Sequence, residues 1–310
     1  MKRRTAFGFA AAAAAGISGV AAVLYKQAPS FWKQYFAEMS RSVLPPPHRP
    51  DPRRWPSYGL SGAWLGHSSV LLKVDGFTIL TDPVFSERVG LDLGVATVGL
   101  KRLVAPALPV EALPQVDLIL LSHAHFDHFD TPTLRLLESA RTSVVTAPQT
   151  SDLLRVPRYR HVRELAWGER AQIGPASVRA LEVNHWGARM RTDTYRGYNG
   201  YAIELHGKRI LFAGDTALTE AFRSEKSSRP FDLAIVPIGA YNPWRRYHCT
   251  PEEAWRMGEM AGVDRFLPVH HQTFQLSREP YTEPIERFYA AAGPRPERVL
   301  LGEIGREFHL

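Results

Sequence analysis

Three histidines and one aspartate stand within six residues of this sequence, directly after a short apolar run. The stretch is Leu120-Leu121-Ser122-His123-Ala124-His125-Phe126-Asp127-His128. Neutral imidazole nitrogens and carboxylate oxygens are the ligands that zinc accepts in proteins. A single histidine in such a place is usually a packed core residue, but four such groups without a metal would be costly to desolvate. The spacing therefore predicts a metal site.

The same spacing predicts how these side chains divide between two ions. In an extended segment alternate residues point to the same side, so His123 and His125 should share one ion. Asp127 and His128 follow the expected turn, where they can reach a second ion a few Å away. Two divalent ions lower the pKa of a shared water and stabilise charge on a phosphoryl or carbonyl oxygen. The predicted chemistry is hydrolysis by a hydroxide that bridges two metal ions.

The pattern from His123 to His128 resembles the HxHxDH signature of the metallo-β-lactamase superfamily. The resemblance extends over roughly residues 58–303 and implies an α/β fold, a four-layer α/β/β/α sandwich. It also implies a downstream histidine that completes the first metal site, for which His185 fits, and a bridging aspartate, for which Asp215 fits. The alternatives are a packed core histidine and a turn-capping aspartate.

The last ligand implied by the resemblance is a histidine in the C-terminal part, where His270 and His271 are neighbours. The relatives' P-x-H-x-G-T-F segment matches Pro268-Val269-His270-His271-Gln272-Thr273-Phe274 and favours His270. Adjacent strand residues point to opposite faces, so only one of the two histidines should reach the metal. Gln272 replaces the usual glycine, which can change the local turn. The implied cofactor is two Zn²⁺ ions, although the same ligands accept Mn²⁺ or Fe²⁺.

Further segments are similar to N-acylphosphatidylethanolamine-hydrolysing phospholipase D and its bacterial relatives. They are Trp64-Leu65-Gly66-His67-Ser68-Ser69, Leu80-Thr81-Asp82-Pro83-Val84-Phe85-Ser86, Pro237-Ile238-Gly239-Ala240-Tyr241, and His248 followed by Pro251-Glu252-Glu253-Ala254. The resemblance implies a phospholipase D-like phosphodiesterase acting on a membrane phospholipid. The broader branch also contains a lactonase, so a lactonase or esterase acting on a small metabolite is the alternative. A non-enzymatic scaffold that retains the metal site is a third reading.

Several residues are candidates for roles beside the metal ligands. Asp127 and Asp215 are expected to be catalytic as well as ligating, and His248 is expected to donate a proton or contact a phosphate, unless it is a plain surface histidine. The candidates for orienting a ligand or binding substrate are His67, Asp82, Tyr241 and Arg189. Arg189 could hold a phosphate as a charged donor, although a solvated loop charge is an equal alternative.

The positive net charge of the chain is confined to its N-terminal part. Residues 1–55 carry nine Lys or Arg and two acidic residues, whereas the remainder carries 29 of each sign. A neutral body offers little attraction to a phosphate backbone, so no nucleic-acid partner is expected. A basic end beside an apolar stretch suits an anionic membrane surface. The single cysteine, Cys249, excludes an internal disulfide framework and a cysteine-based zinc finger.

An uncharged run, Thr5 to Leu24, follows Lys2-Arg3-Arg4. Twenty helical residues can cross a hydrocarbon core, and the basic cluster should stay in the cytoplasm. The prediction is a signal-anchor or transmembrane segment at 1–25 that holds the body on the periplasmic side of a bacterial inner membrane. The alternatives are a secretory signal cleaved on export and a disordered cytoplasmic tail.

The elements that position the predicted site follow a juxtamembrane collar and proline-rich linker at 26–55, so that the hydrolase domain spans 56–310. In the collar, Tyr35 and Phe36 are among the aromatic residues expected at a membrane interface. Apolar runs predict strands at 63–65, 70–74, 77–80, 116–121, 143–146, 177–183, 201–205, 209–213, 233–237 and 266–269. A tight hairpin turn is predicted at Asp75-Gly76. One helix is predicted at 133–139, and another begins after the N-cap Thr250, with Glu253 completing a capping box, and ends before Gly262.

Overall fold

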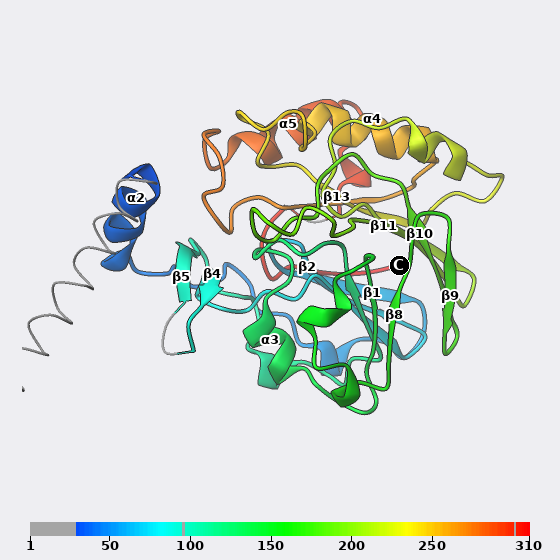
Figure 1. The fold of residues 1–310 in the computed structure, drawn as a ribbon. Coiled ribbons are helices and arrows are strands. Elements are labelled where there is room, and N and C mark those ends of the chain that lie inside the picture. Colours follow the sequence, from blue (N-terminus) through cyan, green and yellow to red (C-terminus); the bar gives the residue numbers. More distant parts are fainter. Residues whose placement is uncertain (1–28, 95–96, 301) are drawn as a thin grey trace, which may run out of the picture.

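Two β-sheets pack face to face in the computed structural model, which describes residues 29–94, 97–300 and 302–310. Helices α4 and α5 lie on the outer side of one sheet and α3 on the outer side of the other (Figure 1). This is the predicted α/β/β/α order of layers. The fold brings loops from both sheets together at one edge of the sandwich, where the predicted site lies.

The larger sheet has seven strands in the order β15-β1-β2-β3-β6-β7-β8. They are β1 (Leu60–Gly66), β2 (Ser69–Val74), β3 (Phe77–Thr81), β6 (Leu118–Leu121), β7 (Ser143–Thr146), β8 (His161–Glu164) and β15 (Glu307–His309). β2 and β3 form the predicted hairpin around Asp75-Gly76, both of which have positive φ, as a tight turn of this kind requires. β3, β6, β7 and β8 are parallel, which explains the unbroken apolar sequence of β6.

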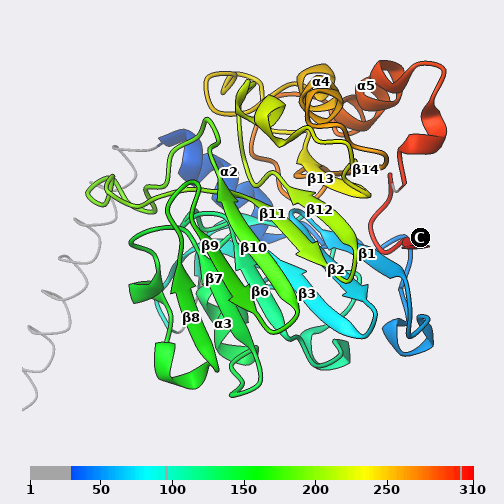
Figure 2. The same cartoon turned by 90° about the vertical axis from the view of Figure 1, so that its right-hand side faces the viewer.

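The smaller sheet has six strands in the order β14-β13-β12-β11-β10-β9. They are β9 (Arg170–Ile173), β10 (Ala176–Leu181), β11 (Gly200–Leu205), β12 (Lys208–Phe212), β13 (Leu233–Pro237) and β14 (Phe266–Val269). Figure 2 shows this sheet in front of the larger one, with α4 and α5 beside β13 and β14. β12, β13 and β14 are parallel, so their carboxyl ends meet at one edge.

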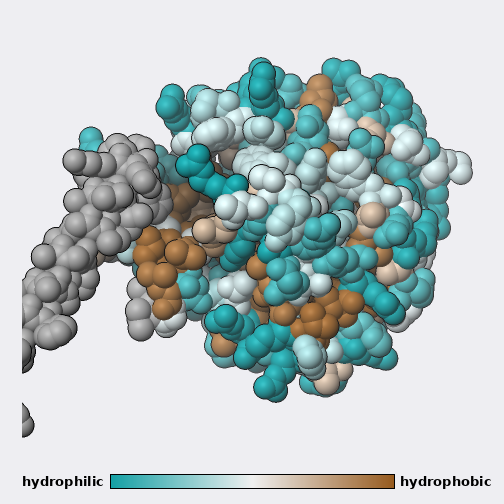
Figure 3. Space-filling model, viewed as in Figure 1, coloured by the Kyte–Doolittle hydropathy of each residue, from teal (hydrophilic) through white to brown (hydrophobic). Residues whose placement is uncertain are grey.

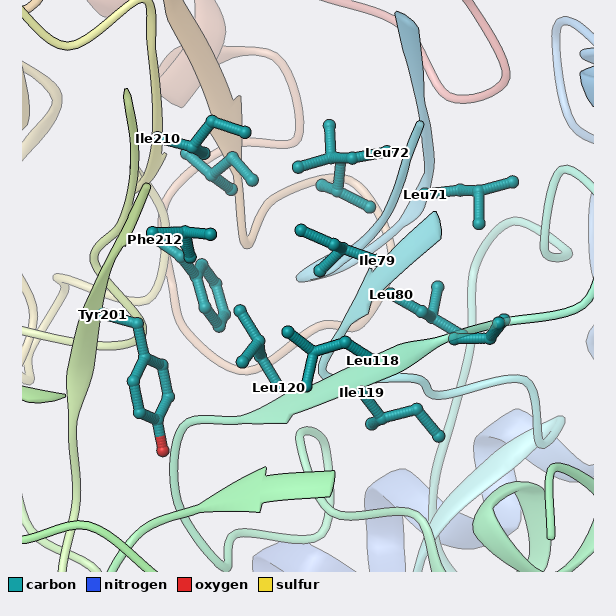
Figure 4. Close-up of a cluster of buried hydrophobic side chains, with 14 of the residues drawn as sticks. Leu71, Leu72, Ile79, Leu80, Leu118, Ile119, Leu120, Tyr201, Ile210 and Phe212 are labelled. Carbon is teal, nitrogen blue, oxygen red and sulfur yellow. The ribbon is translucent and has the colours of Figure 1, made fainter. Parts of the chain in front are cut away.

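The core between the sheets depends on the alternation of side chains along each strand. The register pairs Leu72 with Ile79, and Ile79 with Leu118, so these three side chains share a face. Figure 4 shows that they point toward Ile210 and Phe212 of the other sheet. All five are fully buried, and each such side chain contributes about 1.5–3 kcal/mol through its removal from water. This packing makes the strand ends a rigid base for the loops that follow them.

The helices that cover the outer faces of the sheets are α3 (Thr131–Leu136), α4 (Pro251–Ala261) and α5 (Glu283–Ala292). The capping box predicted at the start of α4 is present, because Thr250 and Glu253 each bond the other's backbone N–H. α3 begins two residues before its predicted start, since Pro132 stands in its first turn, where the lost N–H costs nothing. The short 3-10 helices are Pro52–Arg54, Val110–Ala112, Ser151–Leu153, Val156–Arg158, Ala221–Glu225 and Pro296–Arg298.

A separate two-stranded hairpin, β4 (Arg88–Asp92) and β5 (Thr97–Lys101), projects from the sandwich and was not predicted. Helix α2 (Pro29–Met39) lies against β5 (Figure 1). The Glu38 carboxylate accepts a hydrogen bond from the Lys101 backbone N–H at 2.7 Å, and the Arg88 guanidinium lies 4.6 Å from the centre of the Tyr35 ring. The helix and the hairpin therefore form one unit.

The segment predicted as a collar and linker is attached to the rest of the protein. After α2, Leu44 donates its N–H to Leu103 O and accepts from Ala105 N–H, and His48 N–H bonds Ile304 O. An extended proline-rich chain keeps its carbonyl groups free for such pairing. The predicted membrane segment at 1–25 lies outside the described residues. Among the residues that are described, no helix is long and apolar enough to cross a membrane.

Candidate metal centre

The predicted ligands all follow the carboxyl ends of strands that meet at one edge of the sandwich. The loop from His123 to His128 follows β6, Asp215 follows β12 and His270 follows β14. His185 comes after β10, whose partner strand β11 lies beside β12. Because both sheets present these ends to the same side, residues that are far apart in sequence come together.

The first group consists of His123, His125 and His185. Nε2 of His123 lies 2.8 Å from Nδ1 of His125, and Nε2 of His185 lies 3.3 Å from the same atom. Burial lowers the pKa of all three imidazoles, that of His125 to about 4. They are therefore neutral at pH 7, which leaves their lone pairs available to a metal.

The second group contains Asp127, His128 and His270, as predicted, and also His67. Asp127 Oδ2 lies 3.5 Å from Nε2 of both His128 and His270. His67 Nε2 lies 3.0 Å from the same carboxylate oxygen, and the ligand atoms of all four residues lie within 4.8 Å of one another. Burial lowers the pKa of His67 to about 3, so it donates to Asp127 as a neutral imidazole.

Asp215 lies between the two groups. Its Oδ2 is 3.1 Å from Nε2 of His128, 3.0 Å from Nε2 of His270 and 3.8 Å from Nε2 of His185. Burial by itself would raise the pKa of Asp215, but His128 and His270 hold it well below the usual value. The side chain is thus an anion in contact with both groups.

The donor set fits two divalent cations. In the first group, Nε2 of His123 and Nε2 of His185 both face Nδ1 of His125. Between two neutral imidazole nitrogens only one can carry the hydrogen, so the other nitrogen presents a lone pair. Asp215 Oδ1 is buried and has no hydrogen-bond partner among the described residues. Burial opposes protonation of His128 and His270, yet the adjacent carboxylates of Asp215 and Asp127 raise the pKa of both. A metal cation would supply this positive charge and displace the protons.

The structure separates the two adjacent C-terminal histidines. His270 has φ 64° and turns its Nε2 toward Asp215, whereas His271 packs its ring 4.5 Å from that of Trp64. A left-handed conformation at a residue other than glycine costs of order 1–3 kcal/mol and is typical of functional sites. Gly239 permits this arrangement, because an added Cβ would lie 2.2 Å from His270 O.

Asp82 and Ser122 orient the histidines of both groups. Asp82 accepts from the N–H and the hydroxyl of Ser122 at 2.7 and 2.5 Å and lies 2.7 Å from Nδ1 of His128. The Ser122 hydroxyl also lies 2.8 Å from Nδ1 of His123. These contacts fix which ring nitrogen of His128 faces inward. Ser122 was not predicted, although it lies next to the signature.

Replacing Asp82 by asparagine should lower metal affinity by about 10- to 100-fold, the usual effect of losing a partner that orients a ligand. The substitution keeps the shape of the side chain but removes the charge beside His128. Competition with a chromogenic chelator measures the affinity. The control is Asp117→Asn, because Asp117 bonds the Thr78 N–H at 2.8 Å in the same sheet, away from the metal groups. Equal affinities in the two variants would contradict the role of Asp82.

A cavity of about 640 Å³ opens onto the metal groups. Its polar floor is formed by four side chains, which are His125, Asp127, Asp215 and His248. Its walls are apolar and come from the β4–β5 hairpin, the signature loop, the loop after His185, the segment between β13 and α4, and Leu276. They include Val89, Leu91, Val98, Leu100, Phe126, Trp186, Met190 and Trp244.

His248 faces the cavity with Nδ1 at 3.8 Å from Asp215 Oδ2, so it is placed to meet a substrate. It forms a third group with His185 and Asp215.

Two other predicted residues lie elsewhere, and their expected contacts with a substrate are corrected by the structure. Arg189 donates to the carbonyls of Ala124 and Phe129, and its half-buried guanidinium lies 4.1 Å from the centre of the Phe126 ring. The Tyr241 hydroxyl donates to Glu283 at 2.7 Å and does not line the cavity.

Comparison with known proteins agrees with this geometry. Residues 78–271 match the family model described as the beta-lactamase superfamily domain. The chain belongs to the metallo-β-lactamase superfamily. The predicted fold is thereby confirmed, and with the histidine and aspartate groups this membership makes the protein a metal-dependent hydrolase.

Relatives within the superfamily include proteins of different kinds. An uncharacterised protein of Mycobacterium tuberculosis is 36% identical over 82% of this chain and 70% of its own length. N-acyl-phosphatidylethanolamine-hydrolyzing phospholipase D 1 of Caenorhabditis elegans is 28% identical over 74% of this chain and 68% of its own. The crystal structure of an isothiocyanate hydrolase from Delia radicum gut bacteria superimposes with a TM-score of 0.64 at 19% identity, covering 81% of this chain and 98% of that one. This last similarity concerns the fold alone.

Proposed function

We propose that the protein is a binuclear zinc phosphodiesterase of the phospholipase D type, which hydrolyses the head-group phosphodiester of a membrane phospholipid. The observation that carries the proposal is a cavity with a floor of metal-binding groups and apolar walls. An amphiphile whose charged reacting group joins long alkyl chains matches both parts of it. The similarity to a phospholipase D that hydrolyses N-acyl-phosphatidylethanolamine supports the same substrate class.

In this proposal the seven ligands divide as the groups of side chains suggest. His123, His125 and His185 would hold one ion and Asp127, His128 and His270 the other, with Asp215 as a ligand available to both. Two divalent ions, when bound, lower the pKa of water and stabilise charge on a phosphoryl oxygen. The manganese and iron alternatives use the same ligands.

The protein's own side chains orient these ligands and the substrate. Asp82 holds the ring of His128, while the Tyr247 carbonyl accepts from Nδ1 of His185 at 2.9 Å and leaves its Nε2 facing inward. His67 positions Asp127. His248, on the cavity floor, is the group that can donate a hydrogen bond to a phosphoryl or leaving-group oxygen. The apolar walls exclude water other than the reacting one.

The location of the protein is part of the same proposal. The N-terminal segment would hold the hydrolase on the periplasmic side of a bacterial inner membrane, where phospholipid is abundant. A cleaved export signal remains the alternative to an anchor.

Incubating the zinc-loaded full chain with phospholipid vesicles in H₂¹⁸O should release phosphatidic acid that carries one ¹⁸O in its phosphate. The label enters there because water attacks phosphorus and the bond to the head-group oxygen breaks. Mass spectrometry identifies both products, and Asp127→Ala should yield none. Release of free fatty acid instead, or turnover of lactones without turnover of any phospholipid, would replace the phosphodiesterase proposal by the lactonase or esterase alternative.

A further inference from the structure

Large apolar side chains are exposed around the mouth of the active-site cavity. Leu91, Met190 and Trp244 line the cavity, yet their exposed fractions are 46%, 48% and 49%. Leu93, two residues beyond Leu91, is 56% exposed. Figure 3 shows hydrophobic residues gathered over β4 and β5 on this side of the molecule. A contiguous group of this kind marks an interaction surface rather than scattered exposure. We call this group of four side chains the rim; it consists of Leu91, Leu93, Met190 and Trp244.

The β4–β5 hairpin has two different faces. The register pairs Val89 with Leu100 and Leu91 with Val98, and all four side chains line the cavity. The other face meets α2 through the contacts of Arg88 and Lys101. The apolar face thus continues the cavity wall outward to the rim. No described element covers the exposed side chains at its end.

Unpaired cations accompany the rim. Arg191 follows Met190, and Arg246 lies between Trp244 and Tyr247; both arginines are exposed, and neither has an ion pair among the described residues. The neighbouring Arg245 is paired with Glu253 at 2.6 Å. Tryptophan, tyrosine and arginine together with aliphatic side chains are typical of surfaces that sit at the boundary of an anionic bilayer.

The short length of chain between the uncharged run and α2 supports the same orientation. The uncharged run ends at Leu24, and α2 begins at Pro29 with only four residues between them. That stretch spans at most about 18 Å when fully extended. Because α2 packs on β5, a membrane that holds the uncharged run keeps the hairpin, and so the cavity mouth, close to its surface.

We propose that the rim docks on an anionic phospholipid bilayer, with the cavity mouth facing the membrane, as a second contact distinct from the N-terminal segment. The side chains of Leu91, Leu93, Met190 and Trp244 enter the interface, and Arg191 and Arg246 meet the phosphates. This inference rests on the proposed function for its purpose, because a lipid then enters the cavity directly from the bilayer. Its geometry stands independently of turnover.

Site-specific labelling of the full chain tests the orientation. Cys249 is the only cysteine and is 1% exposed, so a cysteine introduced at the surface takes up an environment-sensitive fluorophore alone. The variant is Leu93→Cys, and the matched control is Leu136→Cys on α3, where the leucine is 66% exposed. Each variant is reconstituted separately in phosphatidylglycerol vesicles and in phosphatidylcholine vesicles, and both kinds of vesicle contain nitroxide-labelled lipid.

The fluorophore at position 93 should be quenched several-fold more strongly than the one at position 136. Arg191→Gln with Arg246→Gln should reduce the quenching in phosphatidylglycerol vesicles and leave it unchanged in phosphatidylcholine vesicles. Equal quenching at both positions, or formation of a cysteine-linked dimer through position 93 without quenching, would overturn the docking proposal. Quenching without phospholipid turnover would overturn the proposed function but not the docking. Turnover without quenching would overturn the docking but not the proposed function.

Discussion

Replacing Asp215 by asparagine is expected to lower kcat/KM about a thousandfold, which corresponds to about 4 kcal/mol of transition-state stabilisation. Asp215 is in contact with both groups of ligands, since its Oδ2 lies 3.0–3.8 Å from histidines of each. The asparagine has the same shape and one charge less. The buried pair of cations would then lack the anion between them, so at least one ion should bind more weakly.

Steady-state kinetics and metal content on the same preparation check this expectation. The matched control is Asp264→Asn, the same chemical change at an exposed carboxylate. Asp264 precedes β14, whereas the ligand His270 follows the other end of that strand. The control should keep both its metal and its activity. If Asp215→Asn retained two ions per chain and full activity, Asp215 would not be the shared ligand. If it lost activity only because it failed to fold, circular dichroism would reveal the loss, and Asp127→Ala would take its place.

Removing the metal is expected to destabilise the protein by about 4 kcal/mol when the free metal is about a thousandfold above its Kd. For a domain of this size that corresponds to a fall in Tm of about 8 °C. The physical reason is that the ligands are buried and closely spaced, with Asp215 and His270 fully enclosed. Without cations, the carboxylates depend on protonated histidines for compensation.

Differential scanning calorimetry with and without a strong chelator measures the shift, and added Zn²⁺ should restore it. Asp215→Asn serves as the comparison, because a variant that already binds metal weakly should respond less to the chelator. An unchanged Tm after the metal content has fallen to near zero would show that metal binding at this site does not raise the free energy of unfolding.

The hairpin and α2 could not have been predicted from their residues alone. β4 and β5 contain the opposed glycines Gly90 and Gly99, which weaken a strand pattern, and their apolar side chains face a cavity that exists only in the folded protein. The aromatic residues of α2 suggested a membrane collar, whereas Tyr35 is in contact with Arg88. Whether the segment before α2 spans a membrane stays a prediction.

Arg189 illustrates the same limit at the site. Its position shortly after His185 suggested a phosphate contact, but its guanidinium donates hydrogen bonds to the carbonyl groups of Ala124 and Phe129. His67 illustrates the opposite case. It was expected to orient a ligand, and the structure brings it into the same group as Asp127, His128 and His270.

The sequence by itself determined the metal-dependent chemistry, because the signature residues are close in the chain and their types and spacing admit few other uses. The fold class followed from the family resemblance that these residues carry. The capping box of α4 and the hairpin at Asp75-Gly76 were equally local and were predicted for the same reason. The resemblance already favoured His270 as the histidine that turns inward, whereas the tertiary structure alone decided what surrounds the metal groups and where the cavity opens. Those features depend on strands distant in sequence that meet at one edge, and no local pattern encodes that meeting.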